Sequence, residues 1–251
     1  MIIRPFNLVH IGVLLLAVIL TIVASLLLRK KEQKTKDYIM IGAAIFNIIF
    51  FVVYKIWLAN DATYEGFSIW KELPLQLCNI NMFLIPLGII LKNKYLLTFS
   101  FYIAPLGALM ALMFPQLDFI NNNVFMLRNI GFYGTHIIIF AMGLMLAPLG
   151  YIEPKMKNIP VLLISAVIFS LGAFVINILL GLTTGVDVNY FYVMNPAGIS
   201  ILELFWSLIP VKYLYLLPAA LILTVYVVIV DLIYRGILFI NKKLTKKAKE
   251  D

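Results

Sequence analysis

The sequence predicts an all-α fold: a polytopic membrane helix bundle with about seven transmembrane helices. Hydrophobic residues make up 63% of the chain and charged residues only 13%, whereas a soluble domain has roughly 45–50% apolar and about 25% charged residues. The mean hydropathy is +1.01. The apolar residues fall in blocks of about 20, the length that crosses a hydrocarbon core of about 30 Å. Lipid offers backbone polar groups no partners, so these blocks are predicted to be helices.

Seven apolar blocks follow one another, and each predicts one span. They cover residues 7–28, 38–58, 75–92, 95–114, 127–149, 159–182 and 212–240. The first is expected to be a retained span rather than a signal peptide, because its apolar run is long and a basic triplet at residues 29–31 closes it. We therefore expect one transmembrane helical domain over residues 1–240 and a basic cytoplasmic tail over 241–251.

The distribution of positive charge orients these spans. Fifteen Lys and Arg residues fall on one side of a seven-span arrangement and four on the other. Cytoplasmic loops carry the excess of Lys and Arg, so the N-terminus is predicted outside and the C-terminus in the cytoplasm. The net charge of +8 then requires no nucleic-acid partner. The basic tail would favour anionic headgroups, but its plainer interpretation, which we favour, is a topology signal on a frayed tail.

Few residues in the chain are suited to binding a metal or a cofactor. One Cys and two widely spaced His residues allow no intrachain disulfide and match no zinc spacing. No glycine-rich phosphate loop occurs in the sequence, and the spans contain no paired carboxylates. We expect no metal and no cofactor. The pattern argues against an ATPase and weakens the case for a proton-coupled carrier.

Polar side chains gather where the third span begins, at its outer end. Gln76, Cys78, Asn79 and Asn81 interrupt an otherwise apolar run. Cys78 and Asn81 are three residues apart, so they share one side of the predicted helix. By helical rise, Cys78 is expected about one turn inside the outer boundary.

The fifth span carries a second polar group near its outer end. Asn129, Tyr133 and His136 are spaced by four and three residues and line one helix face. His136 is expected about two turns inside the outer boundary, at a depth similar to that of Cys78. His10, near the start of the first span, is expected at the membrane interface.

Cys78 and His136 would form a nucleophile and its base if they meet. A nearby imidazole raises the thiolate fraction of a Cys. Asn79, Asn81, Tyr133 or Gln76 would orient the imidazole or donate to an oxyanion. Two plainer interpretations stay open: a membrane Cys is usually a small packing residue, and an intramembrane His also serves structural hydrogen bonds between helices.

The sixth span supplies a third wall of this region. Asn177 and Thr184 are seven residues apart and share a face, and Asn189 follows in the loop. With Gln76, Asn79, Asn81 and Tyr133, these three residues complete the predicted substrate-binding set.

At these residues the chain resembles the YwaF-like bacterial integral membrane proteins, which are related to the eukaryotic transmembrane protein 164 family. The resemblance covers roughly residues 35–240. It rests on the segment Leu73-Pro-Leu-Gln-Leu-Cys78, on residues 102–111, on His136, and on Asn177 with the stretch around residues 184–190. Gln76 stands where the family pattern has a His.

The resemblance implies a lipid acyltransferase that uses Cys78 as the nucleophile and His136 as the general base. Membrane phospholipids would then serve as acyl donor and acceptor at the outer leaflet, where acyl-CoA from the cytosol is absent. Two other classes stay open: a small-solute transporter or binding protein with an outer polar pocket, and an accessory protein whose polar residues only join helices. The oligomeric state is left open.

The composition also favours the plasma membrane of a bacterium as the location of the protein. The chain has no Asn-x-Ser/Thr sequon, is rich in Ile, Lys and Asn, and has brief loops. We expect a multi-pass protein of a bacterial plasma membrane.

Overall fold

The computed structural model describes residues 1–64, 66–115 and 117–250, and the side chains of these residues except 117 and 240–250. The fold is all-α: the described residues form no strand, and an isolated backbone bridge joins Ile2 to Asn123. The predicted basic tail lies outside the described side chains, and Asp251 lies outside the described residues.

Nine α-helices lie within the described residues. They are α1 (Leu8–Leu28), α2 (Gln33–Ala59), α3 (Ile69–Glu72), α4 (Asn81–Ile90), α5 (Lys94–Met113), α6 (Leu127–Met145), α7 (Ile159–Thr184), α8 (Ser200–Leu208) and α9 (Leu217–Glu250). Short 3-10 turns lie at η1 (Leu117–Phe119), η2 (Met156–Asn158), η3 (Tyr190–Tyr192) and η4 (Leu214–Leu216).

Five stretches within the described residues are long and apolar enough to cross a membrane. They are α1, α2, α5, η2 with α7, and η4 with most of α9. The protein is therefore a polytopic membrane helix bundle, as the composition predicts. The count of seven spans and the orientation of the bundle stay predictions.

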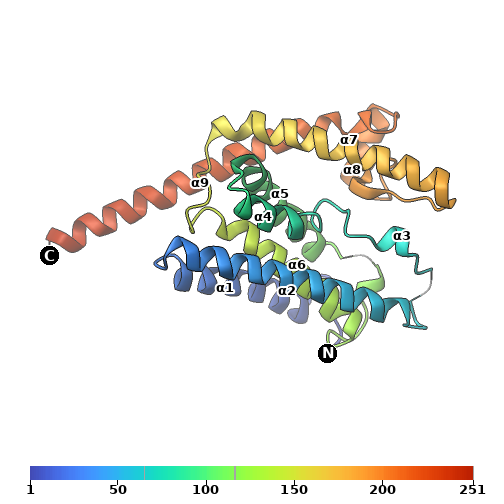
Figure 1. The fold of residues 1–251 in the computed structure, drawn as a ribbon, viewed down its shortest axis with the longest axis horizontal. Coiled ribbons are helices and arrows are strands. Elements are labelled where there is room, and N and C mark those ends of the chain that lie inside the picture. Colours follow the sequence, from blue (N-terminus) through green and yellow to red (C-terminus); the bar gives the residue numbers. More distant parts are fainter. Residues whose placement is uncertain (65, 116, 251) are drawn as a thin grey trace.

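The centre of the bundle is formed by α5 and α6. Helix α6 contacts α1, α2, α4 and α5, and α5 contacts α7 on its other side. In Figure 1, α1 and α2 cover one side of α6, while α7 and α9 lie beyond α4 and α5. Helix α9 projects past the bundle, so that the chain ends far from the N-terminal segment. The outer helices thus expose long apolar faces, as lipid-facing helices do.

The third predicted span differs from a continuous helix. It was expected over residues 75–92, but α4 begins only at Asn81 and has 10 residues. Ten residues rise about 15 Å, half the thickness of a hydrocarbon core. Pro74 lacks a backbone N–H, and Leu73 before it is extended (φ −58°, ψ 146°). The Asn81 amide donates to the Leu77 carbonyl, which competes with regular helix formation.

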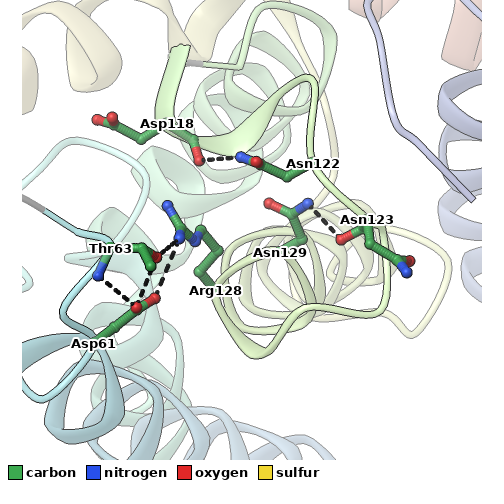
Figure 2. A network of polar contacts seen from close by, with 7 residues as sticks. All are labelled: Asp61, Thr63, Asp118, Asn122, Asn123, Arg128 and Asn129. Carbon is green, nitrogen blue, oxygen red and sulfur yellow. Dashed lines mark hydrogen bonds and ion pairs between the residues drawn. The ribbon is translucent and has the colours of Figure 1, made fainter.

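The loops at one end of the bundle are tied together by a polar network (Figure 2). The Arg128 guanidinium at the start of α6 lies 3.3 Å from the Asp61 carboxylate and also donates to the Thr63 hydroxyl. The Asn129 amide donates to the Asn123 carbonyl at 2.9 Å. This network joins the loop after α2 to the loop between α5 and α6, and so closes one end of the bundle.

Asp61 gives this network a predictable pH dependence. Hydrogen bonds from the Thr63 hydroxyl and backbone N–H, with the Arg128 charge, hold the pKa of Asp61 below its ordinary value. A carboxylate whose pKa is lower in the folded than in the unfolded state stabilises the fold fully at pH values above the unfolded pKa. This stabilisation is lost as the pH falls through the folded pKa. Lowering the pH from about 5 to about 3 should therefore reduce the melting temperature less in Asp61→Asn than in the wild type. Asp187→Asn, in the exposed loop after α7, is the control. Equal pH slopes in Asp61→Asn and the wild type would contradict the role of the network.

Helices α5 and α6 approach each other closely at Gly143. A Cβ there would lie 2.6 Å from Pro105 Cδ and 2.9 Å from Ala104 Cβ. Gly143→Ala should lower the free energy of unfolding in detergent by about 1–3 kcal/mol through overpacking. The control is Gly42→Ala in α2, where a Cβ meets no atom within 4 Å. A melting temperature unchanged by Gly143→Ala would show that the two helices are not in this close contact.

Candidate functional site

Cys78 lies in the non-helical turn that precedes α4. The turn is held by backbone hydrogen bonds from Ile80 N–H to the Gln76 carbonyl at 3.0 Å and from Asn81 N–H to the Cys78 carbonyl at 3.2 Å. Inside a membrane, non-helical backbone is tolerated where protein buries it or where it lines a cavity. Cys78 therefore lies in irregular backbone directly before α4, and the residue as a whole is partly buried.

The sulfur of Cys78 meets the imidazole of His136. The distance from Sγ to Nε2 is 3.4 Å. His136 lies on α6 about 13 Å from the start of that helix, and it is 7% exposed. Two residues 58 positions apart in sequence are thus in contact.

The other ring nitrogen of His136 sets the tautomer. Nδ1 lies 2.7 Å from the Phe132 carbonyl oxygen, which can only accept, so Nδ1 carries the hydrogen. Nε2 of the neutral ring then presents its lone pair to Sγ. The thiol of Cys78 is the donor in this contact, and the imidazole is positioned to accept its proton.

Further polar groups surround the sulfur. The side-chain oxygen of Asn79 lies 3.7 Å from Sγ and is a second acceptor within reach of the thiol hydrogen, and the backbone N–H groups of Cys78 and Asn79 lie near the sulfur. Such N–H groups can stabilise negative charge beside a nucleophile. The helix α5 passes closely behind, where a Cβ on Gly107 would lie 3.3 Å from Cys78 Cβ.

Lys55 was not among the residues predicted to form the site. Its ammonium pairs with Glu72 and lies 4.6 Å from the centroid of the Tyr54 ring. Glu72 is the last residue of α3, so this ion pair joins α2 to the segment that leads into the Cys78 turn. A lone Lys inside an apolar helix is itself a functional hint, which the sequence offered at position 55.

Gln76 and Asn177 hold the loop after α7 against the Cys78 turn. The side-chain oxygen of Gln76 accepts from Phe191 N–H at 3.1 Å. Asn177 brackets Tyr190: its amide donates to the Tyr190 carbonyl and its oxygen accepts from Tyr190 N–H, both at 3.0 Å. The structure thus joins these two residues through η3.

The remaining predicted binding residues make local contacts. The Asn81 amide bonds Leu77, while its Oδ1 is buried with no partner among the described residues. Tyr133 donates to the Phe119 carbonyl at 3.4 Å. Thr184 donates to the Leu180 carbonyl, and the Asn189 amide donates to Asn195. A substrate-binding role for these residues stays a prediction.

His10 is held inside the protein near the start of α1, and its position at the membrane interface stays a prediction. It is fully buried. Its Nδ1 accepts from Phe6 N–H at 2.8 Å, and Nε2 lies 2.6 Å from the Leu112 carbonyl oxygen. The side chain therefore joins the N-terminal segment to the end of α5. Since both ring nitrogens are used in this way, His10 has a structural explanation.

The contact between Sγ and Nε2 predicts the reactivity of the thiol. His136→Gln should slow alkylation of Cys78 by iodoacetamide at pH 7 by about tenfold, because the imidazole no longer takes the thiol proton. Cys78 is the single Cys of the chain, so mass spectrometry of the intact protein reports this site alone. Labelling after denaturation controls for thiol content. Equal rates in the folded variant and wild type would show that His136 does not activate the thiol.

Comparison with known proteins adds a family to this geometry. Neither a search of curated proteins nor a search of solved structures found a match. A family model described as the TMEM164 family matches residues 5–231, which include every residue of the site above. The proposed place in the bacterial YwaF-like branch stays a prediction. The chain is a multi-pass membrane protein that belongs to the TMEM164 family.

Proposed function

We propose that this protein is a lipid acyltransferase or transacylase that works through a covalent intermediate on Cys78. The observation that supports it most is the 3.4 Å contact between Sγ of Cys78 and Nε2 of His136, with the tautomer set by the Phe132 carbonyl. A thiol beside an oriented, unprotonated imidazole nitrogen is the arrangement of an activated nucleophile.

In the first half-reaction, Nε2 of His136 takes the proton of the Cys78 thiol, and the sulfur attacks the ester carbonyl of a donor lipid. The carbonyl oxygen becomes an oxyanion near the N–H groups of Cys78 and Asn79. The C–O ester bond then breaks, and His136 returns its proton to the leaving alkoxide. The products are a deacylated lipid and a thioester on Cys78.

In the second half-reaction, His136 takes a proton from the hydroxyl of an acceptor lipid. The oxygen of that hydroxyl attacks the thioester carbonyl, the C–S bond breaks, and the proton returns to the thiolate. The acyl chain moves without an oxidant, a nucleotide or a metal. With the predicted orientation, the thiol faces the outer leaflet, so the donor is proposed to be a phospholipid and not a soluble thioester.

Exchange of labelled acyl chains between phospholipids in proteoliposomes tests this function. Cys78→Ala should reduce the exchange rate by at least about a thousandfold, since a lost nucleophile leaves the covalent route no substitute. Thr224→Ala on α9, which removes an exposed hydroxyl bonded within its own helix, should leave exchange unchanged. Wild-type exchange in Cys78→Ala would contradict the mechanism.

A second candidate is a small-solute transport or binding site at the same place. The irregular turn before α4, in the predicted third span, favours it, because interrupted helices often line the substrate sites of carriers. Carriers usually show such breaks as a pair in two related halves. Under this alternative, Cys78→Ser would keep full function and a saturating solute would raise the melting temperature. If the protein shows neither acyl exchange nor stabilisation by a solute, a structural accessory protein is supported instead.

A further inference from the structure

A second feature adjoins the Cys78 turn on the side of α7. It is a pocket of about 120 Å³ lined by Leu75, Ile80, Ile168, Phe169, Gly172, Ala173, Ile176, Tyr190 and Phe191. We name it the α7 pocket. Its walls are almost wholly apolar. Leu75 and Ile80 stand on either side of Cys78 in the chain, so the pocket begins in the same turn as the thiol.

We propose that the α7 pocket receives the acyl chain that Cys78 carries, next to the carbonyl carbon. This inference rests on the proposed acyl transfer and adds the place where the transferred chain is held. The occupant follows from the chemistry of the walls, because a pocket without free polar groups recognises hydrocarbon and offers a polar solute no partner.

The polar groups around the pocket are already used. Gln76 Oε1 bonds Phe191 N–H, and Asn177 bonds both the N–H and the carbonyl of Tyr190. Tyr190 also donates its hydroxyl to the Trp70 carbonyl. An apolar cavity whose polar neighbours are satisfied stays dry and accepts apolar ligands.

The size and position of the pocket define how much of a chain it takes. A cavity of about 150 Å³ holds a benzene molecule, so the α7 pocket holds a short segment of an acyl chain. Ile168 in its wall is 61% exposed on a lipid-facing helix. The remaining carbons can therefore continue past Ile168 into the bilayer. Lipid tails are as apolar as the pocket walls, so moving the chain from the bilayer into the pocket gives little hydrophobic free energy. The pocket instead fixes the position of the acyl chain relative to Cys78.

One wall of the pocket is built from unusual backbone. Phe191 and Tyr192 have φ values of 59° and 56°, a region that non-glycine residues seldom occupy. Such conformations persist where the surroundings impose them, and they gather at ligand sites. Here the bonds of Gln76 and Asn177 impose the path of η3, which places Tyr190 and Phe191 against the Cys78 turn.

Gly172 allows the pocket to be filled without disturbing the bundle. A Cβ added there meets no atom within 4 Å, so Gly172→Phe can place its ring in the pocket. Gly181→Phe is the matched control, since a Cβ at Gly181 on the same helix also meets no atom within 4 Å and Gly181 does not line the pocket.

Alkyl methanethiosulfonates test the pocket without any enzymatic activity. The thiolate of Cys78 attacks the reagent, a disulfide to the alkyl chain forms, and methanesulfinate leaves. In Gly172→Phe, the labelling rate with the hexyl reagent relative to the methyl reagent should fall by on the order of tenfold, because the chain is misplaced. The ratio in Gly181→Phe should equal that of the wild type. An unchanged ratio of hexyl to methyl labelling rates in Gly172→Phe would overturn the proposal that the pocket receives the alkyl chain on Cys78.

Acyl exchange separates this proposal from the proposed function. If exchange depends on Cys78 and Gly172→Phe shifts it toward shorter chains, the pocket is supported. If exchange depends on Cys78 but its chain-length profile is the same in Gly172→Phe and wild type, the pocket proposal fails and the transferase stands. If the wild type shows no exchange, the proposed function fails and the labelling ratio alone decides whether the pocket takes an alkyl chain.

Discussion

The irregular turn before α4 is the constraint on which the rest of the site depends. If this turn lies in the predicted third span, hydrocarbon offers its backbone no partner, and the protein itself must supply the hydrogen bonds and the covering surface. Asn81 bonds Leu77 within the turn, and Gln76 bonds the backbone of η3. Gly107 allows α5 to approach the turn closely. The polar residues of this region therefore act first as a scaffold, and the thiol of Cys78 is what the scaffold presents.

The imidazole belongs to the opposite kind of element, a continuous helix at the centre of the bundle. Because α6 contacts four other helices, the position of His136 is defined by packing. Its ring orientation is set by a carbonyl of its own helix. A rigid base facing a thiol on an irregular turn resembles the general logic of nucleophilic sites, in which the scaffold fixes one partner and a loop exposes the other. The turn that carries Cys78 also contributes Leu75 and Ile80 to the apolar pocket against α7.

Much of this arrangement follows from local sequence pattern, and the rest does not. Apolar blocks of membrane length indicate the helices. Counting residues from the block ends predicts similar depths for Cys78 and His136, whose side chains are in contact in the structure. Hydropathy cannot show that the third block begins with non-helical backbone, although Pro74 hints at it. His136 Nδ1 donates to the backbone carbonyl of Phe132, and no pattern of side chains in the sequence reveals that partner. Gln76 and Asn177 look like pocket residues in the sequence, but their partners lie on η3, which is brought to them only by tertiary folding. Lys55 could not be assigned to this region from the sequence, because its ion pair with Glu72 forms only through tertiary folding.

The central claim is that Cys78 becomes acylated, and mass spectrometry of the intact protein tests it directly. After incubation with a phospholipid of one defined chain, we expect a mass increase equal to one acyl group. The adduct should be removed by neutral hydroxylamine, which cleaves thioesters, and it should be absent from Cys78→Ala. An equal adduct in Cys78→Ala, or no adduct on wild-type protein whose exchange activity has been demonstrated in the same lipid, would contradict it.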